Sequence, residues 1–216
     1  NRESQFYKNK SDLTIVFEST HSLLKKYNQS NDINNFSDIQ FERIKKYLNQ
    51  LISINRDLVF FNFYEINDYI FGNYSSLIES SFIFQLRKLN FLLSNFLKNI
   101  DQVRILDVSS IHNSLGSNNF FDPSLYVNYE MVFNIDGNYE VSKKLIDLIR
   151  SKKAFFNKCI ILDLDNIMWG GIVGDDGIDK IEIGDLGIGK AFKELQQWVK
   201  KLKQRMKAQA GNFFHI

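Results

Sequence analysis

Two aspartates separated by one residue follow a hydrophobic run late in the chain. Residues 159–162 are Cys, Ile, Ile and Leu, and Asp163 and Asp165 come next. The run predicts a buried strand, and ligand sites in open parallel sheets lie beyond the carboxyl ends of strands. Because side chains alternate along a strand, both carboxylates are expected on the same side. Two carboxylates held so close together repel one another, unless a cation neutralises them or one of them holds a proton.

This pair suits phosphoryl chemistry. Mg²⁺ binds a few carboxylates and completes its shell with waters and a substrate phosphate. One aspartate can then attack phosphorus while the other moves a proton to the leaving group. The same residues also fit a solvated strand end followed by a turn. On Asp163 and Asp165 alone, both interpretations stay open.

The elements that must position the pair alternate between strands and helices. Apolar runs predict strands, and apolar residues at helical spacing predict helices. The strands are expected at residues 13–17, 58–63, 103–107 and 159–162, and the helices at 37–54, 82–100, 141–149 and 192–202. This alternation indicates an α/β fold with a mainly parallel, doubly wound sheet.

Composition excludes several classes of protein. The chain has 216 residues, of which 44% are hydrophobic, so it is long and apolar enough to bury a core. A net charge of +2 argues against a general nucleic-acid binder. A single cysteine, Cys159, with three scattered histidines excludes an internal disulfide and argues against a zinc cluster. The most apolar stretch, residues 77–100, holds four charged side chains and does not suit a bilayer. A reducing cytoplasm is the expected compartment.

Several segments around the aspartates together resemble a known family. The segments are Ile161-Leu-Asp-Leu-Asp-Asn166, Met168-Trp-Gly-Gly-Ile-Val-Gly-Asp-Asp-Gly177, Ile181-Glu-Ile-Gly184 and Ala191-Phe-Lys-Glu-Leu-Gln196. They resemble the start of the phosphatase-like domain of the FkbH-like family, subfamily IIIC of the haloacid dehalogenase (HAD) superfamily. Residues before about Ala154 more loosely resemble the family's SGNH-hydrolase-like region. The resemblance implies a flavodoxin-like parallel-sheet domain at 1–153 and the first β-loop-α portion of a HAD-like Rossmannoid domain at 154–216.

The resemblance also implies an activity. Members of this type take a glyceryl unit from 1,3-bisphosphoglycerate, dephosphorylate it and load it onto an acyl carrier protein, in polyketide or cell-surface glycan pathways. By position, Asp163 matches the nucleophile and first Mg²⁺ ligand. Asp165 matches the general acid/base, with its backbone carbonyl on the metal. Trp169 and the glycine-rich loop at 170–189 are expected to form a flap over the site, and an ordinary surface hairpin is the alternative.

Two departures from the family pattern favour a second reading. Ile167 stands where the superfamily has a threonine, and the later Ser/Thr, Lys and acidic motifs are not found before Ile216. A truncated chain is therefore expected, and the alternative function is an inactive module that binds a carrier protein or a partner chain. The first domain has no Gly-Asp-Ser or Asp-x-x-His motif, and its nearest pair, Asp107 and His112, has the wrong spacing. His112 and Asp136 are interpreted as loop and capping residues, and a role as polar site residues is the alternative.

Overall fold

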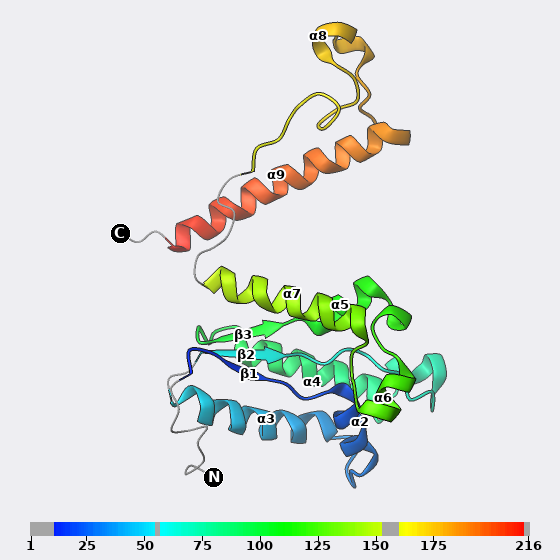
Figure 1. Ribbon diagram of the computed structural model, residues 1–216, viewed down its shortest axis with the longest axis vertical. Helices are drawn as coiled ribbons and strands as arrows, with labels where there is room; N and C mark the ends of the chain where they lie inside the picture. Colours follow the sequence, from blue (N-terminus) through cyan, green and yellow to red (C-terminus); the bar gives the residue numbers. More distant parts are fainter. Residues whose placement is uncertain (1–10, 55–56, 153–159, 214–216) are drawn as a thin grey trace. The chain divides into compact units, whose positions relative to one another are not determined.

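The computed structural model describes residues 11–54, 57–152 and 160–213 (Figure 1). The chain divides into two compact units, Asn1–Phe155 and Phe156–Ile216.

The first unit is built on a parallel sheet. Its strands are β1 (Thr14–Val16), β2 (Leu58–Phe61) and β3 (Val103–Leu106), in the order β1-β2-β3. Val59 of β2 pairs with Ile15 on one side and with Arg104 on the other, both in parallel register. The predicted parallel α/β class is confirmed, and β2 is the central strand of the three.

Helices cover both faces of this sheet (Figure 1). One core lies among α2 (Thr20–Asn28), α3 (Phe36–Ile52), α4 (Phe82–Leu97) and the sheet. The other includes side chains of α5 (Val108–Leu115) and α7 (Ile135–Lys152). All four residues of β2 are buried, and they alternate between the two cores. This double burial explains why the strand is a continuous apolar run.

Two short helices follow β3 and begin at aspartate caps. Asp107 precedes α5 and accepts a hydrogen bond from the Ser110 amide at 3.1 Å. Asp122 precedes α6 (Pro123–Tyr129) and accepts from the Ser124 amide at 2.8 Å. A side-chain oxygen at this position satisfies a backbone amide that the first helical turn leaves unpaired. The 3₁₀ turns Gly72–Leu77 and Ser117–Asn119 complete the loops of this unit.

A buried amide ties three segments of this unit together. The Gln85 side chain on α4 has no solvent exposure. Its Oε1 accepts a hydrogen bond from the Ser37 amide at 2.8 Å, at the start of α3. Its Nε2 donates to the Asn34 carbonyl at 2.8 Å and to the Glu79 carbonyl at 2.7 Å. One fully buried side chain therefore satisfies three backbone groups, of which the Ser37 amide is itself buried.

The second unit has a long helix and a structured loop. Its elements are α8 (Val173–Asp176), the 3₁₀ turn Ile178–Lys180 and α9 (Gly187–Phe213). The strand expected at 159–162 is not found: residues 160–164 form no regular element, and Cys159 lies outside the described residues. A strand exists only when a neighbour pairs with it. Within the described residues of this unit, the pairings are the isolated bridges Asp165–Trp169 and Gly170–Glu182, and Ile161 is 92% exposed.

Across the described ranges, none of the helices combines the length and the apolar character needed to cross a membrane.

Candidate functional site

The two aspartates predicted to do chemistry lie at the start of the loop of the second unit. Asp163 is exposed, and its Oδ1 accepts a hydrogen bond from the following amide, that of Leu164, at 2.8 Å. Asp165 is partly buried. Its Oδ1 accepts from the Trp169 indole nitrogen at 3.0 Å and from the Val173 amide at 3.3 Å. The pair therefore follows an unpaired segment of chain, and Asp165 is held by the loop that comes after it.

Backbone hydrogen bonds close that loop at its base. Gly170 and Glu182 exchange two backbone hydrogen bonds, of 3.0 and 2.8 Å, at its base. Asn166 adopts a left-handed φ of 56°, and its Oδ1 accepts from the Gly171 amide at 2.9 Å. The Asp176 carboxylate accepts from the Ile172 amide at 2.9 Å. This geometry is common to a catalytic flap and to a surface hairpin, so the role of the loop stays a prediction.

Glycine is required at the base of the loop. A Cβ atom at Gly170 would lie 2.9 Å from the Glu182 Cβ and 3.0 Å from the ring of Phe192. Phe192 belongs to α9, so the missing side chain lets the loop base approach this helix. The side-chain Nε2 of Gln196 on α9 also donates to the Met168 carbonyl at 2.7 Å. Together these contacts hold the base of the loop against the side of α9 that carries Phe192 and Gln196.

The donor chemistry of the aspartate pair fits Mg²⁺. Mg²⁺ commonly takes one or two carboxylates from the protein and keeps several waters beside a substrate phosphate. The exposed Asp163 carboxylate can be one such ligand. Searched across the described ranges, the structure shows no group of three or more acidic, histidine or cysteine side chains that could hold a metal ion. The remaining ligands would then be waters, the Asp165 carbonyl and phosphate oxygens.

We predict that Trp169 holds the loop to Asp165. Trp169→Phe keeps an aromatic ring but removes the N–H group that donates to the carboxylate at 3.0 Å. A hydrogen bond to a charged group contributes about 1.5–3 kcal/mol, so the Gly170 and Glu182 amides should exchange hydrogen at least about tenfold faster. Hydrogen exchange read by NMR measures this. The matched control is Trp198→Phe, because Trp198 lies on α9 and is 53% exposed. Unchanged exchange in Trp169→Phe would contradict the prediction.

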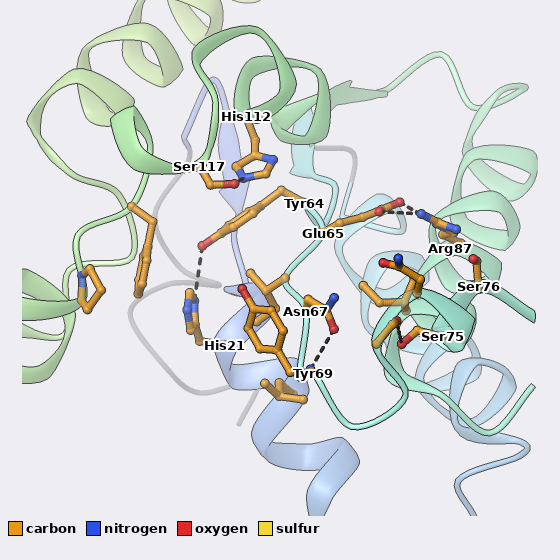
Figure 2. A pocket seen from close by; sticks show the side chains of 17 residues that line it. His21, Tyr64, Glu65, Asn67, Tyr69, Ser75, Ser76, Arg87, His112 and Ser117 are labelled. Carbon is orange, nitrogen blue, oxygen red and sulfur yellow. Dashed lines mark hydrogen bonds and ion pairs between the residues drawn. The ribbon is translucent and has the colours of Figure 1, made fainter. Parts of the chain in front are cut away.

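A second candidate site lies in the first unit, where polar side chains follow each of the three strands. A cavity of about 670 Å³ opens there (Figure 2). His21 comes after β1, Tyr64 and Glu65 after β2, and His112 and Ser117 after β3. The carboxyl ends of parallel strands meet at one edge of a sheet, and this edge is where such folds bind ligands.

The side chains of the cavity are linked in pairs. The Glu65 carboxylate holds the Arg87 guanidinium through two contacts, of 2.7 and 2.8 Å. The Tyr64 hydroxyl and His21 Nδ1 are 3.3 Å apart, and His112 Nε2 lies 3.1 Å from the Ser117 hydroxyl. Figure 2 shows Ser117 and His112 beside one another above Tyr64, with the Glu65–Arg87 pair to the right. The pairs leave the cavity polar but electrically balanced.

Burial sets the protonation of the groups in the cavity. Burial lowers the pKa of His21 and that of His112, so both imidazoles are neutral at pH 7. Burial also raises the pKa of Tyr64, which keeps its hydroxyl protonated. Loss of water around a group penalises its charged form, and this is the largest cause of all three shifts.

The sequence left His112 and Asp136 open between loop or capping roles and a role as polar site residues. Asp107 caps α5, and Asp136 is an exposed residue in the first turn of α7. His112 instead lines the cavity together with residues from the other two strand ends. The signal in the sequence is a polar or aromatic residue soon after each predicted strand, which marks the functional edge of a parallel sheet.

Fold and sites thus define a parallel α/β domain followed by a unit that carries an aspartate pair. Residues 1–150 match the family model described as FkbH, N-terminal domain. The crystal structure of the N-terminal part of protein BF1531 from Bacteroides fragilis, described as containing a phosphatase domain complexed with Mg, matches with a TM-score of 0.88. The two sequences are 41% identical, and the match covers 95% of this chain and 55% of that one. No curated protein matches the chain.

The chain belongs to the family defined by the FkbH N-terminal domain, since the match covers well over half of its residues. It spans about half the length of the crystallised Bacteroides fragilis protein. The predicted membership of the FkbH-like family is confirmed.

Proposed function

We propose that this chain carries the nucleophile and the acid/base residue of a Mg²⁺-dependent phosphoryl hydrolase or transferase. The observation that supports this most directly is the Asp163–Asp165 pair at the base of a closed loop. The pair occurs in a chain 41% identical to a protein described as containing a phosphatase domain complexed with Mg. The resemblance to FkbH-like proteins extends the proposal to the whole protein. Its substrate would be 1,3-bisphosphoglycerate, and its product a glyceryl unit loaded onto an acyl carrier protein.

The residues of the chain have separate roles in this proposal. Bound Mg²⁺ would neutralise charge on the carboxylates and on the phosphoryl oxygens. Asp163, which is exposed, attacks the phosphorus atom and forms an aspartyl phosphate. Asp165 gives a proton to the departing oxygen and later takes one from the water that hydrolyses the aspartyl phosphate. Trp169 and the Val173 amide keep the Asp165 carboxylate oriented through their hydrogen bonds.

The proposal is tested with a version of the protein that extends through the complete phosphatase domain. This protein is incubated with Mg²⁺, 1,3-bisphosphoglycerate and a carrier protein that bears its phosphopantetheine arm. Phosphate release and a mass gain of one glyceryl unit on the carrier are the expected results. Phosphate release without acylation of the carrier would limit the function to a phosphatase. Absence of both would overturn the proposal and favour a non-catalytic module that binds a carrier protein or a partner chain.

A further inference from the structure

Two successive backbone amides in the loop of the second unit are held by carboxylates. The Ile172 amide donates to Asp176 Oδ2 at 2.9 Å. The next amide, that of Val173, donates at 3.3 Å to Oδ1 of Asp165, the proposed acid/base residue. Because the two amides belong to adjacent residues, a carboxylate that fixes the first also restricts where the second can point. Asp176 can therefore act on Asp165 through the backbone.

Asp176 holds Ile172 from two sides. Its carboxylate accepts from the Ile172 amide, and its own backbone amide donates to the Ile172 carbonyl at 2.8 Å. Ile172 stands at the N-terminal end of α8, and its apolar side chain does not cap that helix. A side chain that reaches back from within a helix to the amide at its N-terminal end stabilises the first turn. Asp176 thus closes the turn at 172–176 with both its backbone and its side chain.

The glycine before this turn leaves room for the carboxylate. Gly171 has a φ of +97°, a conformation that favours glycine. A Cβ atom at Gly171 would lie 3.2 Å from Asp176 Oδ2, which is tighter than an ordinary van der Waals contact. The chain therefore turns at a residue without a side chain, and the Asp176 carboxylate can reach the amide that follows.

The hydrogen bonds on Asp165 distinguish its two carboxylate oxygens. Oδ1 accepts from the Trp169 indole nitrogen at 3.0 Å and from the Val173 amide at 3.3 Å. An oxygen whose lone pairs already accept two N–H groups is poorly placed to carry a proton as well. Oδ2 is therefore the oxygen that gives and takes the proton. The bond from Val173 exceeds the usual length of about 2.7–3.2 Å, so it is the more easily lost of the two.

We propose that Asp176 is a positioning residue for the acid/base chemistry of Asp165. By holding the Ile172 amide, Asp176 keeps the Val173 amide on Oδ1 of Asp165 and leaves Oδ2 for proton transfer. Asp176 has this role only where Asp165 is the acid/base residue, so the inference rests on the proposed function. A misplacement of about 1 Å can lower a rate about 10²-fold, so loss of the Asp176 carboxylate should slow proton transfer about 10–10²-fold.

The substrate p-nitrophenyl phosphate separates the two steps of the proposed reaction. In the first step, a bond forms between Asp163 and phosphorus while the bond to p-nitrophenolate breaks, and this leaving group departs with its electron pair and needs no proton. In the second step, water attacks the aspartyl phosphate and gives a proton to Asp165, which frees phosphate and restores the Asp163 carboxylate. Asp165 then loses the proton to solvent. A residue that positions Asp165 should therefore affect the second step alone.

The test rapidly mixes p-nitrophenyl phosphate and Mg²⁺ with the protein extended through the complete phosphatase domain. Asp176→Ala should release the first equivalent of p-nitrophenolate as fast as the unmodified protein does. The turnover that follows should be about 10–10²-fold slower, so kcat falls while kcat/KM is unchanged. Asp176→Asn should restore turnover, because its side chain keeps an oxygen that can accept from the Ile172 amide.

Asp175→Ala is the matched control. Asp175 is the neighbouring acid in the same turn of α8, and it is exposed as Asp176 is. Within the described part of the chain, its backbone amide donates to the Ile172 carbonyl, but its carboxylate has no hydrogen bond or ion pair. The control therefore removes the same charge without releasing the Ile172 amide, and both steps should be unchanged.

Three results would overturn the inference while the proposed function stands. They are turnover by Asp176→Ala as fast as that by Asp175→Ala, equal slowing of both steps, and equal hydrogen exchange at the Val173 amide in the two variants, read by NMR. Equal slowing of both steps would show that Asp176 only stabilises the loop. An unmodified protein that releases no phosphate would overturn the proposed function and the inference together. Asp176 is exposed, so each variant should keep the melting temperature of the unmodified protein.

Discussion

Asp163→Asn should lower Mg²⁺-dependent phosphate release by at least about 10³-fold, because a covalent nucleophile has no substitute in its site. An amide oxygen attacks phosphorus poorly, and it brings no negative charge to the metal ion. The carboxylate is exposed, and its Oδ1 contacts the amide of the next residue, so the substitution should leave the melting temperature unchanged. Phosphate release and thermal unfolding are measured on the same preparation, with the phosphatase domain complete.

The matched control for this experiment is Asp179→Asn. Asp179 is another exposed aspartate of the second unit, in the 3₁₀ turn Ile178–Lys180. The control removes the same charge from the same unit and should retain full activity. If Asp163→Asn and Asp179→Asn released phosphate equally fast, Asp163 would not be the nucleophile. The proposed function would then fail.

Gln85→Leu should destabilise the first unit by about 3 kcal/mol, since the buried Ser37 amide left without a partner costs about 1–3 kcal/mol and two partly buried carbonyls lose their bonds as well. Leucine has a similar volume but cannot bond to the Ser37 amide or to the carbonyls of Asn34 and Glu79. Added apolar contact offsets only part of that loss. In a domain of this size each kcal/mol lowers the melting temperature by about 2–4 °C, so a decrease of about 10 °C is expected.

Thermal and urea unfolding followed by circular dichroism measure this effect. Gln50→Leu is the matched control, because Gln50 is an exposed residue of α3. The control makes the same chemical change at the surface and should shift the melting temperature by little. A Gln85→Leu protein as stable as the Gln50→Leu protein would show that the three backbone groups find other partners.

The sequence predicted the sheet of the first unit because its strands are short apolar runs and its long helices have a clear period. The central strand, Leu58–Phe61, is an unbroken run of this kind and is buried throughout. Helix α2 was not predicted, since its buried face offers only Thr20, Leu23 and Tyr27 in nine residues. The prediction of a strand at 159–162 was wrong for another reason. Its composition suits a strand, but pairing depends on a neighbour that local sequence does not contain.

The two candidate sites also differ in how far local sequence could predict them. The spacing of Asp163 and Asp165 is a local pattern, so the sequence could identify the pair. The hydrogen bond from Trp169 to Asp165 depends on the path of the loop and had no signature. The cavity beside His112 brings together residues as far apart as His21 and Ser117, which only the parallel sheet places side by side. Local patterns therefore found the chemistry that lies within one segment and missed the chemistry shared among three.

The alternating burial of β2 has a consequence for how the first unit unfolds. Leu58 and Phe60 belong to the core beside α3 and α4, while Val59 and Phe61 belong to the core beside α5 and α7. Neither core can open without releasing a strand that the other needs. The two halves of the sheet are thus coupled into one cooperative unit, in which partial melting from either face is suppressed. The same coupling reaches Tyr64 and Glu65, which come shortly after this strand, so the cavity keeps its shape for as long as the whole domain is folded.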